Sequence, residues 1–282
     1  MILSGKELSK NIKLEIKDKI NKNKVALRPV LEVIIVGENS ASQVYVNQKE
    51  KACKEVGIAS IITRLPESIS EEDLLKHIQM SNRSDYTHGI LVQLPLPKHI
   101  NENKVIETIA KEKDVDGFHP LNVAGLWQKT SHITACTPKG ILRLIDETKI
   151  DLSGKKVVVI GRSNIVGLPV SKLLLDRNCT VTICHSKTKN LKEECLSADI
   201  LVVAIGKANF ITSDMVKDGA IIIDVGINRI EGKLYGDVDF ENVKDKCSFI
   251  TPVPGGVGPM TIACLMENTF EVFKNQGYYI ER

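Results

Sequence analysis

The stretch Val157-Val-Val-Ile-Gly-Arg-Ser-Asn-Ile-Val-Gly-Leu-Pro169 carries the strongest fold signal in the chain. A run of β-branched residues ends at Gly161, and a helical pattern begins at Gly167. Gly161 permits a tight turn, Gly167 permits close helix–strand packing, and backbone N–H groups at a helix start can hold a phosphate. Ser163 stands where the middle glycine of G-x-G-x-x-G would be. Taken alone, the motif fits either a dinucleotide site or an ordinary glycine-containing turn.

The residues that follow repeat one pattern, which favours the first interpretation. Short Val/Ile/Leu runs recur about every 20 residues, with helical segments between them. Because these runs do not alternate with polar residues, they indicate strands covered on both faces, as in a parallel sheet. The pattern predicts a doubly wound, Rossmann-like α/β domain. The expected strands are Val157–Ile160, Val181–Cys184, Leu201–Ile205 and Ile221–Val225.

The first half of the chain shows a similar alternation. Strands are expected at Val30–Val36, Ile61–Leu65 and Ile90–Leu94, and helices near 4–22, 40–56, 70–81 and 101–110. A length of 282 residues also exceeds the roughly 100–200 of one domain. We therefore expect two α/β domains, residues 1–146 and 147–258, with a cleft between them. A closing helix within 259–282 is expected to pack back on the first domain.

Composition narrows the class of protein. Hydrophobic residues make up 43% and charged residues 26%, which excludes disordered and low-complexity chains. The longest apolar run has six residues, against the roughly 20 that a membrane helix needs. The start of the chain lacks the apolar segment of a secretory signal. Seven cysteines without a C-x-x-C pair fit neither a disulfide framework nor a zinc site. We expect a cytoplasmic protein with reduced thiols, no membrane partner and no metal.

Positive charge is concentrated in residues 1–30, which hold eight Lys/Arg against three Asp/Glu. Nucleic-acid binding is one interpretation, and a solvated helix face is the other. Leu8, Ile12, Ile16 and Ile20 recur every fourth residue and form one apolar stripe with lysines around it. No aromatic residue in the stretch could stack on bases. We therefore expect a surface helix and no nucleic-acid partner.

In the second half of the chain, the end of the second expected strand, Val181–Cys184, bears on the choice of dinucleotide. It reads Thr182-Ile-Cys-His-Ser-Lys187, and the first acid after it is Glu193. An NAD-preferring site places Asp or Glu near this position to bind the ribose 2′-hydroxyl. Polar and basic residues occur there instead, and Arg162 lies in the glycine turn, a set that suits a 2′-phosphate. We expect NADP in preference to NAD, although a solvated turn would explain His185 or Lys187 alone.

Two later loops also belong to the second half of the chain. Asp224-Val-Gly-Ile-Asn228 ends a strand, where cofactor-contacting loops gather. Thr251-Pro-Val-Pro-Gly-Gly-Val-Gly-Pro259 places three glycines among prolines before the last helix. Such a turn is rigid and allows a ligand close to the backbone. A purely structural turn explains one or two of these residues but not so dense a run.

The first half contains polar residues that need an explanation. Tyr45 and Lys49 are four residues apart and share a helix face, which can place an aromatic ring beside an amine. Gln93 lies in an apolar strand end, where either a backbone group or a ligand satisfies its amide. Lys113-Asp-Val-Asp-Gly117 resembles a calcium loop, but position 12 is Gly125 rather than Glu. The remaining interpretations are a turn, or a carboxylate that binds an amino-pyrimidine edge.

Together these motifs resemble the bifunctional methylenetetrahydrofolate dehydrogenase/cyclohydrolase family, in its stand-alone bacterial form. They occur in the family's order and spread over nearly the whole chain. One departure is Ala135, where the family usually has proline, and this change loosens a loop without touching a catalytic role. The residues that carry the resemblance are Tyr45–Lys49, Gly89–Pro95, Lys113–Gly117, Cys136–Gly140, Gly161–Gly167 and Pro252–Thr261.

The resemblance implies chemistry in the inter-domain cleft, between a folate-binding catalytic domain and an NADP-binding domain. Hydride passes from 5,10-methylenetetrahydrofolate to NADP+, and water then converts the methenyl cation into 10-formyltetrahydrofolate. Lys49 would transfer protons in the hydrolytic step, and Tyr45 would stack on the folate and help to orient Lys49. Gln93 would hydrogen-bond near Lys49 and tune it, and Asp116 would anchor the amino edge of the pterin. Because the methenyl cation is already electrophilic, positioning and proton transfer suffice for its hydrolysis.

The remaining roles also come from the resemblance. A homodimer is expected, since the family is usually dimeric. Two other functions stay open: a dehydrogenase with weak cyclohydrolase activity, and an NADP-binding regulator without catalysis. The expected cofactor contacts are Gly161, Arg162, Ser163, Ser186 and Ile227, and further substrate contacts are Pro254, Gly255 and Gly256.

Overall fold

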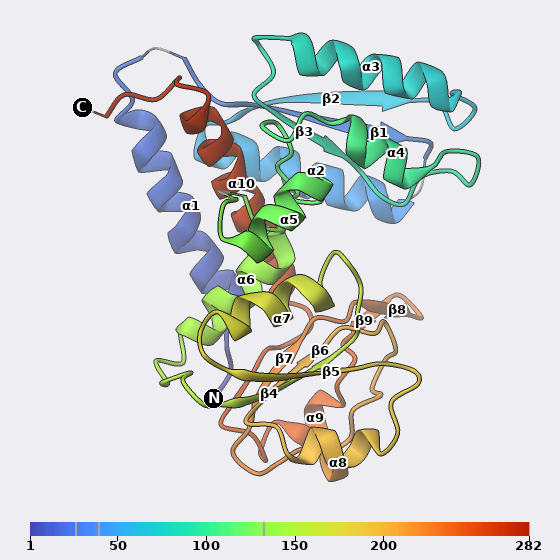
Figure 1. Ribbon diagram of the computed structural model, residues 1–282, viewed down its shortest axis with the longest axis vertical. Coiled ribbons are helices and arrows are strands. Elements are labelled where there is room, and N and C mark those ends of the chain that lie inside the picture. The colour runs from blue at the N-terminus through green and yellow to red at the C-terminus, as the bar shows by residue number, and fades with distance from the viewer. Residues whose placement is uncertain (26, 39, 132, 282) are drawn as a thin grey trace. The chain divides into compact units, whose positions relative to one another are not determined.

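The computed structural model describes residues 1–25, 27–38, 40–131 and 133–281 (Figure 1). It divides into two compact units. Residues 10–136 and 262–282 form what we call the three-stranded unit, and residues 1–9 and 137–261 form the five-stranded unit. The division lies between residues 136 and 137, whereas the sequence suggests 146. The functional domain limits at 146 and 258 remain predictions.

The three-stranded unit is built on a parallel sheet in the order β2-β1-β3. Its strands are β1 (Val30–Val36), β2 (Ala59–Leu65) and β3 (Gly89–Val92). The central strand β1 is almost wholly buried, while the edge strand β2 alternates between exposed and half-buried residues. Because parallel strands all end at one edge, the residues that follow β1 and β3 lie close together.

Helices cover both faces of this sheet (Figure 1). On one face, Ile34 and Ile90 pack against Leu74 and Ile78 of α3 and Val105 of α4. The helix α2 lies against the other face. Helices with residues in this unit are α1 (Gly5–Asn21), α2 (Ser40–Val56), α3 (Glu71–Arg83), α4 (Glu102–Thr108), α5 (Pro120–Gln128) and α10 (Val257–Asn275).

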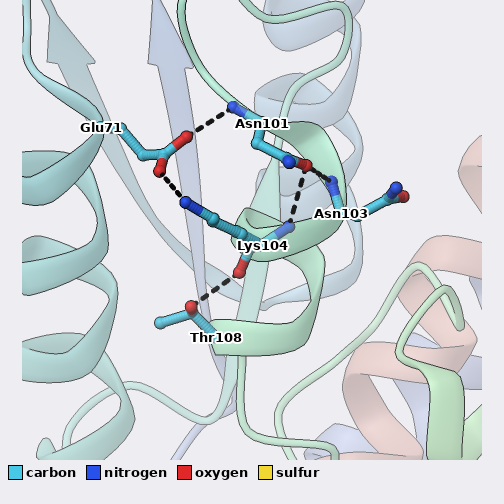
Figure 2. A network of polar contacts seen from close by, with 5 residues as sticks. All are labelled: Glu71, Asn101, Asn103, Lys104 and Thr108. Atoms are coloured by element: carbon cyan, nitrogen blue, oxygen red, sulfur yellow. Dashed lines mark hydrogen bonds and ion pairs between the residues drawn. The ribbon is translucent and has the colours of Figure 1, made fainter.

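Figure 2 shows the polar contacts that fix α4 against α3. The Glu71 carboxylate accepts a hydrogen bond from the Asn101 backbone N–H and pairs with the Lys104 ammonium, both at 2.7 Å. The Asn101 Oδ1 in turn accepts from the N–H groups of Asn103 at 3.0 Å and Lys104 at 3.4 Å. Since an N-cap satisfies N–H groups that have no helical partner, α4 begins at a defined place beyond β3.

The five-stranded unit contains a parallel sheet in the order β10-β7-β6-β4-β5. Its strands are β4 (Lys156–Ile160), β5 (Thr180–Cys184), β6 (Ile200–Val203), β7 (Ile221–Asp224) and β10 (Phe249–Ile250). Counted along the chain, the order is 2-1-3-4-5, which is a doubly wound order of the flavodoxin type. The order in which the chain adds strands to the sheet reverses between β4 and β6. The carboxyl ends of these two strands therefore frame the place where ligands bind in such sheets.

Helices also cover both faces of the five-stranded sheet. The helix α7 contacts β4 and β5, while Cys195 of α8, Val216 and Val243 of α9 pack against Val158 on the opposite face. The other elements are α6 (Cys136–Asp146), α7 (Gly167–Leu175), α8 (Leu191–Leu196), η1 (Ser213–Met215), α9 (Phe240–Val243) and the hairpin strands β8 (Asn228–Ile230) and β9 (Lys233–Tyr235).

The expected strands and helices are present, and none of their ends differs by more than two residues. Three features were not expected: the helix α5, the short helix α9 and the hairpin β8–β9. The prediction of burial on both faces holds for β6 and β7 but is wrong for β5, which lies at the sheet edge and has half-buried residues. Among the described helices, none combines the length and apolar character that a membrane crossing requires.

Candidate active site

The helix α2 and the end of β3 bring Lys49 and Gln93 together. The Lys49 ammonium donates a hydrogen bond to Gln93 Oε1 at 2.9 Å. Gln93 Nε2 donates to the Leu94 carbonyl at 2.7 Å, which turns the amide oxygen toward Lys49. The Gln93 backbone N–H continues the sheet by donating to Ile34 at 2.8 Å. The amide is therefore satisfied by a backbone group and by Lys49 at once. Tyr45 lies one helical turn before Lys49 and is half-buried.

The segment 113–117 forms a turn whose polar groups mostly serve structure. The Lys113 ammonium donates to two backbone carbonyls at the end of α3, at 2.6 and 3.1 Å. The buried Asp114 carboxylate accepts from the backbone N–H groups of Gly117 at 3.0 Å and His119 at 2.9 Å. It also accepts from Asn122 Nδ2 at 2.9 Å. Asp114 thus holds the turn from residue 114 to residue 119 closed.

Asp116 differs from its neighbours. Its carboxylate makes no hydrogen bond within the described part of the chain, and it lines a small pocket of about 10 Å³ beside the end of β3. Burial raises the pKa of Asp116 to about 6, the charge of Lys49 opposes the rise, and the charge of Asp114 adds to it. By exposure Asp116 is half-buried, and an acceptor in such a place without a donor is expected to receive one from a ligand. The other walls of the pocket are largely apolar, including Leu94 and Phe118.

A side chain of the helix α10 stabilises this turn. The fully buried Asn268 donates through Nδ2 to the carbonyls of Val115 and Thr134, both at 2.9 Å. A Cβ on Gly117 would lie 2.6 Å from the backbone nitrogen of Ala135, so only glycine fits there. The loop that carries the Ala135 departure is therefore tightly packed. Sequence reasoning missed Asn268, because its role depends on contact between segments more than 130 residues apart.

In the five-stranded unit, the two glycines of the β4–α7 turn are required by close contacts. Gly161 has φ +122°, and a Cβ there would lie 2.3 Å from the Ala204 carbonyl oxygen. A Cβ on Gly167 would lie 2.2 Å from the Gly161 carbonyl oxygen. The turn therefore runs directly beside the end of β6, at the point where the sheet reverses its winding. Backbone so free of side chains is suited to the close approach of a dinucleotide.

Ser163 replaces the middle glycine in a defined way. Its Oγ accepts hydrogen bonds from the backbone N–H groups of Val166 at 3.2 Å and Gly167 at 3.4 Å, at the start of α7. The hydroxyl thus completes the turn from within. Arg162 and Ser163 are both exposed at the carboxyl end of β4. Their placement fits contact with the phosphates of a bound dinucleotide.

The segment after β5 forms a tight turn with exposed side chains. The His185 backbone N–H donates to Thr188 Oγ1 at 2.8 Å, and His185 Nδ1 accepts from the Lys187 N–H at 3.1 Å. His185 therefore shapes the turn, while Ser186 and Lys187 are exposed. Ile227, beyond β7, is 46% exposed and lies 3.9 Å from where a Cβ on Gly258 would stand. These cofactor candidates occupy the carboxyl ends of β5 and β7.

The glycines after β10 are explained in part by the chain's own packing. Gly255 accepts a hydrogen bond from the Lys6 backbone N–H at 3.1 Å. A Cβ on Gly5 would lie 1.8 Å from the Gly256 carbonyl oxygen, so the start of α1 packs directly on this turn. Pro254 is exposed, whereas Gly255 and Gly256 are buried. Their assignment to substrate binding stays a prediction.

The structure thus gathers the candidates into two groups. Lys49, Gln93 and Asp116 lie together in the three-stranded unit, with Tyr45 on the same helix as Lys49. The cofactor candidates lie at the carboxyl edge of the five-stranded sheet. Because the two units are described separately, the cleft between the domains stays a prediction. In the described ranges, no three His, Cys, Asp or Glu side chains are grouped so that they could hold a metal ion.

Comparison with known proteins decides the family. The model for the catalytic domain of tetrahydrofolate dehydrogenase/cyclohydrolase matches residues 3–116, and the model for its NAD(P)-binding domain matches residues 135–277. The chain belongs to the tetrahydrofolate dehydrogenase/cyclohydrolase family. The catalytic-domain match includes Tyr45, Lys49, Gln93 and Asp116, and the NAD(P)-binding match includes Gly161 and the loops beyond it.

Individual members of the tetrahydrofolate dehydrogenase/cyclohydrolase family are similar over almost the full length. The bifunctional protein FolD of Campylobacter hominis is 56% identical over 98% of both chains. The crystal structure of the FolD dehydrogenase/cyclohydrolase of Campylobacter jejuni has a TM-score of 0.95 at 51% identity, covering 98% of this chain and 99% of that one. The Trypanosoma brucei enzyme, solved with NADP and an inhibitor, has a TM-score of 0.93 at 34% identity and 98% coverage of both chains. The chain is thus an enzyme of folate one-carbon metabolism.

Proposed function

We propose that this chain oxidises 5,10-methylenetetrahydrofolate with NADP+ and hydrolyses the methenyl product, and that Lys49, Gln93, Tyr45 and Asp116 carry out the folate chemistry. The observation that carries this assignment is the contact between Lys49 and Gln93 beside an Asp116 carboxylate that has no hydrogen bond within the described residues. One group can move a proton, one fixes its position, and one remains to bind substrate.

Asp116 serves recognition. The pterin ring presents an amino group and a neighbouring ring N–H on one edge, and a carboxylate can accept both hydrogen bonds at once. The burial that raises the pKa of Asp116 also strengthens such bonds, because little water competes for the carboxylate. Leu94 and Phe118 lie beside Asp116 and offer apolar side chains that an aromatic ring system can contact.

Lys49 serves proton transfer in the hydrolytic step. Water adds to the methenyl carbon, and the C–N5 bond then breaks while N5 takes up a proton and the carbon becomes the N10-formyl group. The oxygen of the added water loses both of its protons, of which one ends on N5 and the other is released to solvent, so a single mobile amine can serve both transfers. Gln93 holds that amine through a neutral oxygen and does not neutralise its charge.

The five-stranded unit supplies the dinucleotide site. Bound NADP+ would accept the hydride of the methylene carbon. Because Gly161 has no side chain, the dinucleotide can come close to the protein backbone there. The exposed residues around the site are Arg162, Ser163, Ser186 and Ile227. Since no acid follows β5 before Glu193, nothing there would repel a 2′-phosphate.

The hydrolytic assignment is tested with Lys49→Met. We expect methenyl hydrolysis to fall by roughly 10²–10⁴-fold, the usual contribution of a proton-transfer group. Lys51→Met is the matched control, because Lys51 is exposed on the same helix. The decay of purified 5,10-methenyltetrahydrofolate is followed by absorbance. Full hydrolysis by Lys49→Met would remove the assignment, and weak hydrolysis by the unaltered enzyme would favour the dehydrogenase alternative.

Cofactor preference is tested by initial rates with NADP+ and NAD+ at equal concentrations. We expect NADP+ to be preferred, and Arg162→Ala to reduce that preference by roughly 10-fold through the loss of one charge-assisted contact. Equal or faster rates with NAD+ would overturn the interpretation of Arg162 and Ser186.

We propose further that the chain is a cytoplasmic homodimer that binds no nucleic acid. Support for the dimer comes from the family resemblance and from β5, a sheet-edge strand with half-buried side chains. Support for a reducing compartment comes from the seven cysteines, all buried and free in the described structure. Light scattering on the purified protein gives the mass in solution, cell fractionation gives the location, and a gel-shift assay tests nucleic-acid binding.

A further inference from the structure

We infer that Asp237 is a positioning residue for dinucleotide binding, which holds the loop after β6 in its binding conformation with the help of Asp224. The inference rests on the proposed NADP site at the same edge of the sheet. Neither carboxylate is expected to touch the dinucleotide, because both are almost completely buried.

The loop that Asp237 holds lies at the reversal point of the sheet. It follows β6, and its first residue, Ala204, contributes the carbonyl oxygen that a Cβ on Gly161 would meet at 2.3 Å. The β4 turn and the β6 loop therefore form adjacent walls of one site. Gly206 in this loop has φ +67°, a conformation that a side chain disfavours. Such a loop needs an external constraint to keep one conformation.

Asp237 supplies that constraint through four hydrogen bonds. Its Oδ2 accepts from the backbone N–H groups of Ile205 at 2.7 Å and Gly206 at 2.9 Å. Its Oδ1 accepts from the Lys207 N–H at 2.8 Å and from Asn228 Nδ2 at 2.9 Å. Three consecutive loop N–H groups thus converge on one carboxylate. Asn228 joins this loop to the segment beyond β7 that contains the cofactor candidate Ile227.

Asp224 holds Asp237 in turn. Its Oδ1 accepts from the N–H groups of Asp237 at 2.9 Å and Gly226 at 3.0 Å, and its Oδ2 accepts from Val238 at 3.0 Å. A Cβ on Gly236 would lie 1.8 Å from Asp224 Oδ2, and a Cβ on Gly226 would lie 2.1 Å from Asp237 Oδ1. The two glycines therefore allow the carboxylates to reach the backbone. Burial and the charge of Asp237 raise the pKa of Asp224 to about 7, against the effect of its N–H donors.

The chemistry explains why an acid is needed at position 237. A carboxylate is an acceptor at both oxygens, whereas an amide has one acceptor and one NH₂ group. In Asp237→Asn, the NH₂ would face N–H donors, and at least two of the four hydrogen bonds would be lost. The loop would then be held less firmly, although the volume of the side chain is almost unchanged.

The two activities of the enzyme make this testable. Hydrolysis of the methenyl cation uses no dinucleotide, so a change confined to the β6 loop should spare it. We expect Asp237→Asn to raise the KM for NADP+ and the Kd for NADPH by roughly 10–100-fold, with a smaller effect on kcat, since two or more buried hydrogen bonds are lost. Methenyl hydrolysis should stay within about twofold of the unaltered enzyme because its groups lie in the other unit.

The experiment measures NADPH binding by fluorescence and both activities by absorbance. Asp245→Asn, an exposed acid in the same unit, is the matched control. Gly206→Ala is a second variant, because it strains the loop at φ +67° with nothing within 4 Å of the added methyl, and it should also raise the Kd. If Asp237→Asn does not fold, Gly206→Ala and Asn228→Ala decide, and normal NADPH binding by both would overturn the inference.

Other outcomes are equally clear. Unchanged NADPH binding by folded Asp237→Asn would overturn the inference while leaving the proposed function intact. Equal loss of both activities with a lower Tm would mean that Asp237 only stabilises the fold, and would also overturn it. Failure of the unaltered enzyme to bind NADPH would instead count against the proposed NADP site.

Discussion

At the scale of single residues, the turn around Asp116 divides its polar groups between two tasks. Lys113 and Asp114 satisfy backbone groups of the turn and of α3, and Asn268 satisfies the carbonyl of Val115. Asp116 alone in this turn has a carboxylate without a hydrogen bond among the described residues, and the proposal assigns its acceptors to a ligand. A carboxylate held in this way is costly for the folded state, because burial disfavours its ionised form.

That cost gives a prediction about pH. The pKa of Asp116 is raised from 3.8 to about 6, so its ionisation costs stability increasingly as pH rises through this range and fully above it. Asp116→Asn should therefore raise the free energy of unfolding by about 1–3 kcal/mol at pH 8, and by much less near pH 4. Urea unfolding, followed by the fluorescence of the single tryptophan, Trp127, measures both values.

Activity should change in the opposite direction, since the amide accepts only one of the two pterin hydrogen bonds. Asp114→Asn is the comparison: it removes an acceptor that the turn needs and should lower stability at both pH values. A stability gain of equal size at pH 4 and pH 8 would contradict the assignment of the cost to ionisation.

At the scale of elements, α4 depends on its cap. Asn101→Ala removes the Oδ1 that accepts from the first N–H groups of the helix, and should lower the free energy of unfolding by about 0.5–2 kcal/mol. Asn103→Ala, two residues further on, removes an exposed side chain and should change stability by less than about 0.5 kcal/mol. Urea unfolding of the two variants side by side measures the difference, and equal effects would show that the cap contributes nothing.

The elements also show what a sequence reveals about a fold. The strands β4, β6 and β7 were predictable because continuous Val/Ile runs reflect burial on both faces. The helix α5 was missed because its cap is a histidine, His119, and its exposed face carries the apolar Leu121 and Trp127, which blurs the helical pattern. Strand order was beyond reach as well, since pairing of β4 with β6 joins segments about 40 residues apart.

The features of the candidate site likewise fall into those that local sequence predicts and those that depend on tertiary structure. The tight glycines and the proximity of Tyr45 to Lys49 follow from local spacing, so sequence reasoning could propose them. The hydrogen bond from Lys49 to Gln93 spans 44 residues, and the bonds of Asp237 to the β6 loop span 30 to 32. Such contacts depend on tertiary structure. For Ser163, spacing showed the missing glycine, but only the structure shows the hydroxyl that completes the turn.

At the scale of the whole molecule, the proposed site divides between the two units. The three-stranded unit carries the proposed proton-transfer and recognition groups, and the five-stranded unit carries the proposed dinucleotide edge. Hydride transfer needs both parts, whereas hydrolysis needs the folate groups alone. Substitutions in the Gly161 turn should therefore separate the activities: Gly161→Ala should abolish NADPH binding measured by fluorescence and leave methenyl hydrolysis largely intact, and parallel loss of both would contradict this division.

The most direct test of one chain performing both steps is a single absorbance time course. The unaltered enzyme is mixed with 5,10-methylenetetrahydrofolate and NADP+, and NADPH and the methenyl species are followed together. We predict that NADPH accumulates while the methenyl signal rises only briefly and then falls faster than it does without enzyme. A methenyl signal that persists and decays at the uncatalysed rate would contradict the account.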